Sequence, residues 1–294
     1  MNWDEYWQYL QQRGFSPHTI ANYRYDIQAF ERYLTKHDLD WQRLDSQWLR
    51  RYSAWIHRQG LGPRSIQRRL AAVRKAMEFW HQQGAMGQNL AIGIRAPRFQ
   101  PPLPKPVDVD QLQQLLDQQP NNALQARDLA MMELAYSAGL RVAELVQVKR
   151  QDVDWSQRLI SVWGKGSKQR IVPVGQKALT AIQRWLAYGQ VNAQQDYLFV
   201  SNRGRPLTTR QVQKRFKDYG RQYGVDLHPH RLRHSCASHF LESSGDLRAV
   251  QEMLGHEQLA TTQVYTRLDF QQLAQVYDKA HPRARSQNHQ EEES

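Results

Sequence analysis

The sequence is poor in cysteine, in acidic side chains and in long apolar runs. Its one cysteine, Cys236, excludes an internal disulfide and indicates a reducing compartment. Cys236 lies between small residues in an apolar helical stretch, so we expect it to be packed rather than nucleophilic. No stretch reaches the roughly 18 uncharged apolar residues of a spanning helix, and the acidic first residues predict no signal peptide. These absences favour a cytoplasmic protein.

The shortage of acidic residues leaves the chain with a strong positive charge. It has 40 Lys and Arg residues and only 28 Asp and Glu, which gives a net charge of +12 and an isoelectric point near 9.9. Such a charge indicates a polyanionic partner, and nucleic acid is the first candidate. A membrane surface is the weaker alternative.

Proline is concentrated in one segment, which divides the chain. A length of 294 residues suggests about two domains. Five prolines fall between residues 97 and 106, a composition typical of a semi-rigid linker that can span ~30 Å in ten residues. The sequence therefore predicts an N-terminal domain over 1–95, a linker over 96–106, a second domain over 107–282 and a disordered tail over 283–294.

The first domain is predicted to be all helical. Apolar residues recur at helical spacing after the helix starts Ser16-Pro17 and Gly62-Pro63. Residues 46–77 contain eight Lys or Arg and no Asp or Glu. Because a solvated face usually mixes both signs, we expect part of this run to contact DNA phosphates. The predicted DNA-binding residues are Arg64, Arg68, Arg69 and Lys75.

The second domain is predicted to mix helices with a small sheet. Two short β-type runs, 159–163 and 170–174, are separated by a glycine-containing turn, which predicts a β-hairpin with Lys165 at its turn. Arg141 is predicted to open a helix over 141–149. The last helix, 269–280, carries an apolar face.

Six residues spread over the second domain are the strongest functional signal. They occur in Gly-Leu-Arg-Val-Ala-Glu-Leu, Gly-Lys-Gly, His-Arg-Leu-Arg-His and Leu-Gly-His, with a tyrosine nine residues after the last. Each motif alone is weak, but the whole set in this order, at spacings of 24, 65, 3, 23 and 9, is very hard to obtain by chance. The candidate catalytic residues are Arg141, Lys165, His230, Arg233, His256 and Tyr265.

This set of side chains can break a phosphodiester without a metal. Tyr265 is the expected nucleophile, and it must be activated because a free phenol has a pKa of ~10. Arg141 and Arg233 suit the non-bridging oxygens, since their planar forks match phosphate and stay charged where charge grows in the transition state. Lys165 is the expected general acid for the leaving 5′ oxygen.

The histidines complete the expected mechanism. His230 lies one helical turn before Arg233, so both can serve the same phosphate. We expect His230 to be the base for the phenol or a donor to the oxyanion, and His256 to be a second phosphate donor. DNA would be joined to Tyr265 through its 3′ phosphate. No metal, ATP or other cofactor is expected, because side chains supply the cations and the phosphotyrosine keeps the bond energy.

The motif resembles that of the tyrosine recombinase (phage integrase) family, Arg…Lys…His-x-x-Arg…His…Tyr. The Ser-Pro-His-Thr-Ile-Ala-Asn-Tyr segment that begins at Ser16 also resembles the start of the family's N-terminal domain, so the resemblance covers nearly the whole chain. It implies a mostly α, two-domain fold. An all-helical, SAM-like core-binding domain would precede a mixed α+β catalytic domain with a small sheet.

Three further segments, 241–248, 265–270 and 276–284, resemble the bacterial Xer branch of that family. This resemblance implies recombination of double-stranded DNA at a short dif-like site. It also implies work beside a XerD-type recombinase in a heterotetramer, under an FtsK-type translocase, to resolve chromosome dimers at cell division. In the family the last helix docks on a neighbouring subunit, and the apolar face of 270–277 fits that role about as well as packing on its own domain.

Other interpretations remain open. His230 and His234 have the i, i+4 spacing of a zinc site, although no glutamate follows His230 and arginines intervene. A phage, transposon or integron integrase shares all the catalytic residues. A type IB topoisomerase uses similar chemistry, but the helical N-terminal domain and the chain length argue against it. A non-enzymatic architectural DNA-binding protein would lack a catalytic residue, and none is missing.

Overall fold

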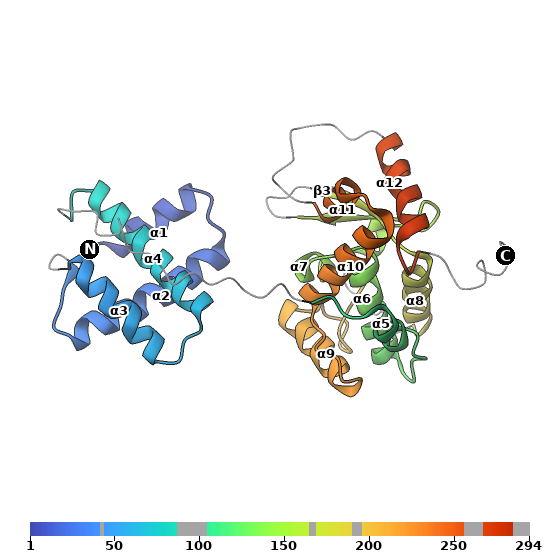
Figure 1. Ribbon diagram of the computed structural model, residues 1–294, viewed down its shortest axis with the longest axis horizontal. Helices are drawn as coiled ribbons and strands as arrows, with labels where there is room; N and C mark the ends of the chain where they lie inside the picture. The colour runs from blue at the N-terminus through green and yellow to red at the C-terminus, as the bar shows by residue number, and fades with distance from the viewer. Residues whose placement is uncertain (42–43, 87–104, 165–168, 190–195, 256–266, 285–294) are drawn as a thin grey trace. The chain divides into compact units, whose positions relative to one another are not determined.

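The computed structural model has two compact units, Met1–Pro102 and Leu103–Ser294, each with its own hydrophobic core (Figure 1). Most of the predicted linker over 96–106 lies outside the residues that the structure describes. The structure describes the whole chain except residues 42–43, 87–104, 165–168, 190–195, 256–266 and 285–294.

The N-terminal unit consists of helices around an aromatic core. As predicted, Ser16 caps helix α2, its Oγ accepting the Thr19 N–H at 3.1 Å, with Pro17 in the first turn. The ring of Phe30 contacts those of Trp41 and Tyr52 with centroids 4.9 and 4.7 Å apart. Its described helices are α1 (Trp3–Gln12), α2 (Pro17–Lys36), α3 (Ser46–Arg58) and α4 (Pro63–Gln82).

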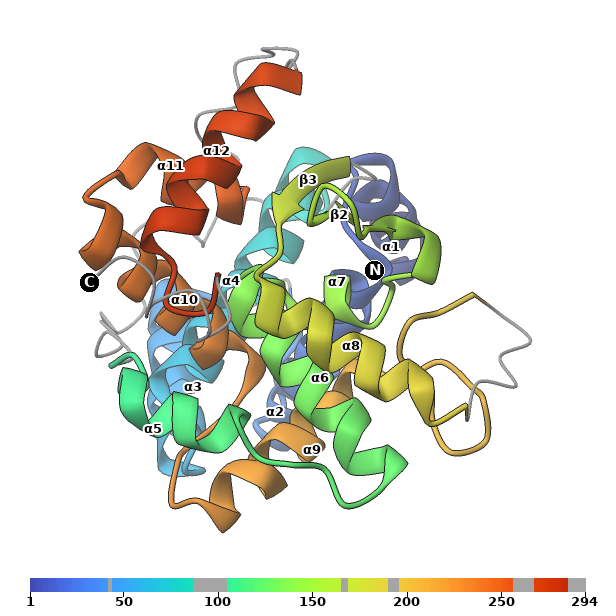
Figure 2. The same cartoon turned by 90° about the vertical axis from the view of Figure 1, so that its right-hand side faces the viewer.

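The C-terminal unit is built around α6 (Ala123–Ser137), a helix buried on nearly every side. It belongs inside the core although it includes the buried charged residues Arg127, Asp128 and Glu133, and α8 and α10 pack directly on it (Figure 2). The other helices of this unit are α5 (Val109–Leu116), α7 (Val142–Leu145), α8 (Gln176–Ala187), α9 (Thr209–Gln222), α10 (Pro229–Ser244), α11 (Leu247–Leu254) and α12 (Arg267–Ala280).

A three-stranded antiparallel sheet lies beside these helices, in the order β1 (Val153–Asp154), β2 (Leu159–Trp163) and β3 (Gln169–Pro173). Strands β2 and β3 form the predicted hairpin. Ile160 pairs with Val172, and both side chains are buried. The hairpin is thus confirmed, whereas Lys165 at its turn lies outside the described residues. The mostly helical, two-domain fold class is confirmed as well.

The helix predicted over 141–149 is wrong in its length. Helix α7 makes one turn and is followed by turns and a 3-10 helix at Arg150–Asp152. The backbone instead pairs with a distant segment: the Leu198 N–H donates to the Val148 carbonyl at 2.8 Å, and the Arg150 N–H to the Asp196 carbonyl at 2.9 Å. These long-range hydrogen bonds take the groups that a longer helix would use.

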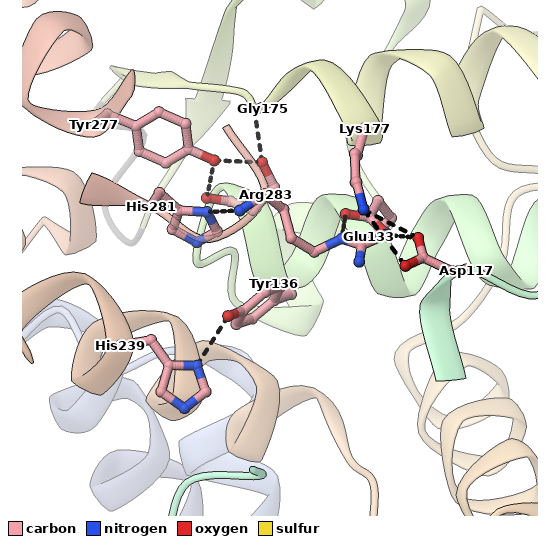
Figure 3. Close-up of polar contacts among 10 residues, drawn as sticks. Asp117, Glu133, Tyr136, Gly175, Lys177, His239, Tyr277, His281 and Arg283 are labelled. Atoms are coloured by element: carbon pink, nitrogen blue, oxygen red, sulfur yellow. Dashed lines mark hydrogen bonds and ion pairs between the residues drawn. The ribbon is translucent and has the colours of Figure 1, made fainter. Parts of the chain in front are cut away.

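The tail predicted to begin at residue 283 begins too early. Arg283 and Ala284 are 2% and 1% exposed, so they belong to the core of the C-terminal unit. The Ala284 carbonyl accepts the Gln176 N–H at 2.9 Å. The Arg283 guanidinium donates to Glu133 at 2.5 Å and to Asp117 at 2.8 Å (Figure 3). The ion pair with a carboxylate on α6 is what holds this segment; residues 285–294 lie outside the described part.

The last helix is held by the same core. Leu273 and Tyr277 are buried, and the Tyr277 hydroxyl lies 2.7 Å from the Ser137 hydroxyl on α6. For this part of the apolar face, packing on its own domain is therefore the interpretation that the structure favours. Burial lowers the pKa of the neighbouring His281 to about 3, so its neutral Nδ1 accepts the Arg283 N–H at 3.2 Å.

None of the helices in the described segments has the length and apolarity needed to cross a bilayer.

We expect Arg283→Met to lower the free energy of unfolding by about 3 kcal/mol, because it leaves the buried Glu133 carboxylate without its cation. Burial already raises the pKa of Glu133, and Arg283 only partly offsets this effect. Urea titration of the full chain measures the change. Lys177→Met is the control: Lys177 pairs at 3.3 Å with the half-exposed Asp117, so its loss should cost less than about 1 kcal/mol. Equal losses would contradict the prediction.

Candidate active site

Arg233 is the most deeply fixed of the candidate catalytic residues that the structure describes. Helix α10 carries it into the core, where its side chain is 9% exposed. Its guanidinium donates to the Gly139 carbonyl at 2.5 Å and to the Leu254 carbonyl at 2.7 Å. Leu254 is the last residue of α11, where backbone acceptors lack helical partners and carry partial negative charge, and Gly139 follows the end of α6 by two residues. Arg233 therefore joins the ends of two helices.

The charge on Arg233 persists despite its burial. Burial and, to a smaller extent, the nearby cation Arg141 lower its pKa to about 10, while Glu144 opposes the change. A pKa of about 10 still leaves the guanidinium protonated at neutral pH. The group is thus a permanent cation in a poorly hydrated place, where a phosphate would feel it strongly.

Arg141 lies at the start of helix α7, as its N-cap residue. Its backbone N–H donates to Glu144 Oε2 at 2.8 Å and its Nη1 to Glu144 Oε1 at 2.9 Å. Its Nη2 lies 3.5 Å from the Gly255 carbonyl. The side chain is nevertheless 46% exposed, so Arg141 is oriented by the protein yet remains open to a ligand.

Glu144 is almost completely buried and is shared by two arginines. Besides Arg141, Arg170 on β3 donates to both of its oxygens, at 2.7 and 2.9 Å. Burial works against ionisation of this carboxyl, but hydrogen bonds and charge from Arg170 and Arg141 prevail and hold its pKa below the usual range. Glu144 is therefore a carboxylate at neutral pH.

Two glycines allow these groups to approach one another. Gly139 has φ +57°, and a Cβ there would come 2.7 Å from a methyl carbon of Leu254. Gly255 has φ +65°, and a Cβ there would come 2.9 Å from Cδ of Arg170. Only glycine combines this left-handed backbone with the absence of a side chain. The carbonyls that receive Arg233 and Arg141 thus depend on both glycines.

His230 lies in the first turn of α10, exposed and one helical turn before Arg233. Its ring is nearly parallel to that of His228, with centroids 6.4 Å apart. His228 caps the helix by accepting the Arg231 N–H at 3.1 Å. His230 is thus exposed whereas Arg233 is buried, and their action on the same phosphate stays a prediction.

Three candidate residues, Lys165, His256 and Tyr265, lie outside the described residues. The structure does describe residues on either side of these gaps. Trp163 and Gln169 pair across the hairpin on either side of the turn, and Gly255 contacts Arg141. The structure therefore brings together Arg141 and Arg233 and leaves the other three as predictions.

The predicted DNA-binding residues lie on helix α4. Arg64 is exposed. Arg68 forms an ion pair with the buried Asp26 of α2, and Arg69 is 12% exposed, with its Nε 3.7 Å from the same carboxylate. Lys75 donates to Glu78 at 2.9 Å. Part of the charge of this helix is thus balanced inside the protein.

Sequence reasoning missed Glu144 and Arg170 as parts of the site. Glu144 had a signal, since it follows Arg141 by three residues, the spacing of side chains that meet on a helix. Arg170 had none, because the Glu144 that it binds lies 26 residues away. As expected, Cys236 is packed in the core, where burial raises its pKa to about 12.

Comparison with known proteins identifies the class. The profile described as "Phage integrase family" matches residues 105–272, and that described as "Phage integrase, N-terminal SAM-like domain" matches residues 3–84. The chain therefore belongs to the phage integrase family.

Its curated relatives are more specific. The chain is 46% identical over 285 residues to the tyrosine recombinase XerC of Actinobacillus pleuropneumoniae serotype 7 (strain AP76), covering 95% of this chain and 93% of that protein. It is 47% identical over 283 residues to XerC of Shewanella oneidensis, covering 95% and 92%. The chain is a site-specific DNA recombinase of XerC type, and the integrase alternative is not favoured.

Solved structures share the fold. A XerH site-specific recombinase bound to a palindromic difH substrate superposes with a TM-score of 0.71 at 22% identity, covering 90% of this chain and 81% of that chain. A dimer of lambda integrase(75-356) bound to a COC′ core site gives a TM-score of 0.69 at 19% identity, covering 90% of this chain and 97% of that chain.

We expect Gly139→Ala to destabilise the C-terminal unit and to slow DNA cleavage, because the methyl group collides with Leu254 and moves the carbonyl that receives Arg233. Gly189→Ala is the matched control, since Gly189 has φ +64° and open space around it. The control should cost about 1 kcal/mol from backbone strain alone, and Gly139→Ala about 2 kcal/mol more from overpacking.

Thermal or urea unfolding measures the difference, and a cleavage assay on folded protein measures the rate. An equal loss of stability in both variants would show that the close contact between residue 139 and Leu254 adds nothing to the cost of the substitution.

Proposed function

We propose that this chain cuts and rejoins double-stranded DNA at a short dif-like site, through a 3′-phosphotyrosine on Tyr265. One observation carries the proposal. Arg233 donates to the Leu254 carbonyl, and Arg141, 92 positions earlier in the sequence, contacts the next carbonyl, that of Gly255. Two guanidinium groups of different origin thus meet at the residues that directly precede His256. A scissile phosphate there could bind both.

The proposed reaction is a reversible transesterification. The phenol oxygen of Tyr265 attacks phosphorus, and its proton passes to His230. The bond to the 5′ oxygen breaks, and Lys165 gives that oxygen a proton. Arg141, Arg233 and His256 stabilise the negative charge that grows on the non-bridging oxygens. A 5′ hydroxyl then attacks the phosphotyrosine in the reverse sense and restores the DNA backbone without a cofactor.

Two basic surfaces support binding of the DNA backbone. The first is helix α4, which presents Arg64 to solvent, and a surface hollow there is lined by Arg64 and Arg68. The second, which the sequence analysis did not single out, is helix α9 in the C-terminal unit. Its exposed cations are Arg210, Lys214, Arg215, Lys217 and Arg221. Cations on both units fit a polyanion that contacts both.

The XerC relatives support the biological role. We infer that the chain works beside a XerD-type recombinase in a heterotetramer, under an FtsK-type translocase, and resolves chromosome dimers at cell division. The cytoplasm, where the bacterial chromosome lies, is the expected location.

We expect wild-type protein to form a denaturation-resistant adduct with a nicked dif-like suicide duplex in EDTA without ATP, because the nick traps the phosphotyrosine. Tyr265→Phe should bind the same duplex with wild-type affinity and form no adduct, since it lacks only the attacking oxygen. Denaturing electrophoresis of labelled DNA measures both.

The XerD-type partner is added in a parallel reaction. An adduct with Tyr265→Phe would remove Tyr265 as the nucleophile. Binding with no wild-type adduct, with or without the partner, would favour an architectural DNA-binding protein instead.

Binding should weaken steeply with salt, and we expect Arg64→Gln to reduce the slope of log K against log [salt] by about 1, because one phosphate contact is lost. Arg13→Gln is the control, since Arg13 is exposed at the end of α1, where its guanidinium stacks on Tyr9. Fluorescence anisotropy over a salt series measures both slopes, and an unchanged slope in Arg64→Gln would contradict the α4 assignment.

A further inference from the structure

The carboxylate of Glu144 is fully used by two arginines. Oε1 accepts from Nη1 of Arg141 at 2.9 Å and from Nη1 of Arg170 at 2.7 Å. Oε2 accepts the backbone N–H of Arg141 at 2.8 Å and Nη2 of Arg170 at 2.9 Å. Each oxygen therefore accepts one hydrogen bond from each arginine. If one arginine moves, the hydrogen bonds that Glu144 makes to the other arginine must change as well.

Arg170 also contacts the end of helix α11. The Cβ position of Gly255 lies 2.9 Å from its Cδ and 3.2 Å from its Nε, so the Arg170 side chain lies directly against this glycine. The carbonyl of the same glycine faces Nη2 of Arg141. One side chain on β3 thus touches the carboxylate that orients Arg141 and the residue that precedes His256.

The charge balance makes this arrangement demanding. Glu144 is 3% exposed, and a buried carboxylate is costly unless cations and hydrogen bonds compensate it. Arg170 is itself only 17% exposed. Its planar fork donates from two nitrogens to both oxygens in parallel, a geometry that the single nitrogen of an ammonium group does not reproduce.

We propose that Arg170 is a positioning residue for the recombination reaction, which holds Arg141 through Glu144 and seats Gly255 at the end of α11. The inference rests on the proposed role of Arg141 as a phosphate ligand. With Arg170 in place, Glu144 holds Arg141 by one edge and leaves the rest of its guanidinium open to the phosphate. Without Arg170, the whole carboxylate charge acts on Arg141, and the contact with Gly255 is lost.

The test compares Arg170→Lys and Arg170→Met with Arg127→Lys as the matched control. Arg127 is also a buried arginine that makes two hydrogen bonds to a carboxylate, at 3.0 and 2.7 Å from Asp128, but it lies on α6 and also donates to the Val200 carbonyl. Both lysine variants thus replace a fork by a single ammonium at a buried carboxylate. Single-turnover cleavage of the suicide duplex, DNA affinity and thermal unfolding are measured for each.

We expect Arg170→Lys to cleave at least about tenfold more slowly, because small misplacements of a catalytic group are costly. Its DNA affinity should stay within about twofold of wild type, as should the cleavage rate of folded Arg127→Lys, because the hydrogen bonds of Arg127 go to Asp128 and Val200 rather than to Glu144. Glu144→Gln should also be slow, and adding Arg170→Lys to it should cost little more, since both act through one contact.

A pH profile gives a readout that a purely structural role would not change. The charged groups that face Glu144 are Arg141, Arg170 on β3 and Arg233 on α10. In wild type the pKa of Glu144 is low, so its contribution is present above that pKa and is lost only in acid. In Arg170→Met the effect of burial prevails, so the pKa of Glu144 rises. As the pH is lowered, cleavage by this variant should therefore fall at a higher pH than cleavage by wild type, and it should recover as the pH is raised.

Wild-type cleavage and an unshifted pH profile in Arg170→Met would overturn the inference. The inference would also be overturned if cleavage by the Arg170 variants fell only in proportion to the fraction of unfolded protein, and if Arg127→Lys lost as much cleavage. The proposed function is tested separately by wild type and Arg141→Ala: no wild-type adduct, or undiminished cleavage by Arg141→Ala, would refute that function itself. A normal adduct that needs Arg141 but not Arg170 would refute only the inference.

Discussion

The buried guanidinium of Arg233 is the interaction on which the candidate site depends. It lies where α6 and α11 end, and it satisfies the last carbonyl of α11 and the carbonyl of Gly139, just after α6. Because the same group is expected to bind phosphate, the fold and the proposed chemistry share one cation. Gly139 is part of this arrangement, since any larger residue would separate α6 from Leu254.

Around Arg233 the site has more positive than negative charge. Glu144 is the carboxylate that the structure places among Arg141, Arg170 and Arg233. One negative charge shared by three cations leaves a net attraction for a phosphate, while it also orients the two arginines that it binds. Glu144 therefore organises the site without neutralising it, and the exposed side of Arg141 remains available to DNA.

The C-terminal segment shows where composition misleads. Residues after Pro282 are polar and charged, a composition that predicts disorder. Arg283 nevertheless lies in the core, because Glu133 on α6 needs a cation there. Likewise the pattern after Arg141 predicts a longer helix than α7, since helical periodicity contains no information about the segment at 196–198 that pairs with this stretch. In both cases the partner lies far away in the sequence.

The sequence by itself determined most of the elements and the family to which the chain belongs. Helix starts at Ser16 and Pro63, the hairpin at 159–173 and the order of Arg141, His230 and Arg233 follow from local periodicity, capping and motif spacing. Only the tertiary structure decided that Arg170 meets Glu144 and Gly255, and that Arg233 joins two helix ends. The physical reason is the distance in sequence between the partners. Periodicity, capping and motif spacing reflect interactions between residues close in sequence, whereas a buried charge is compensated by whichever side chain the packed fold brings next to it.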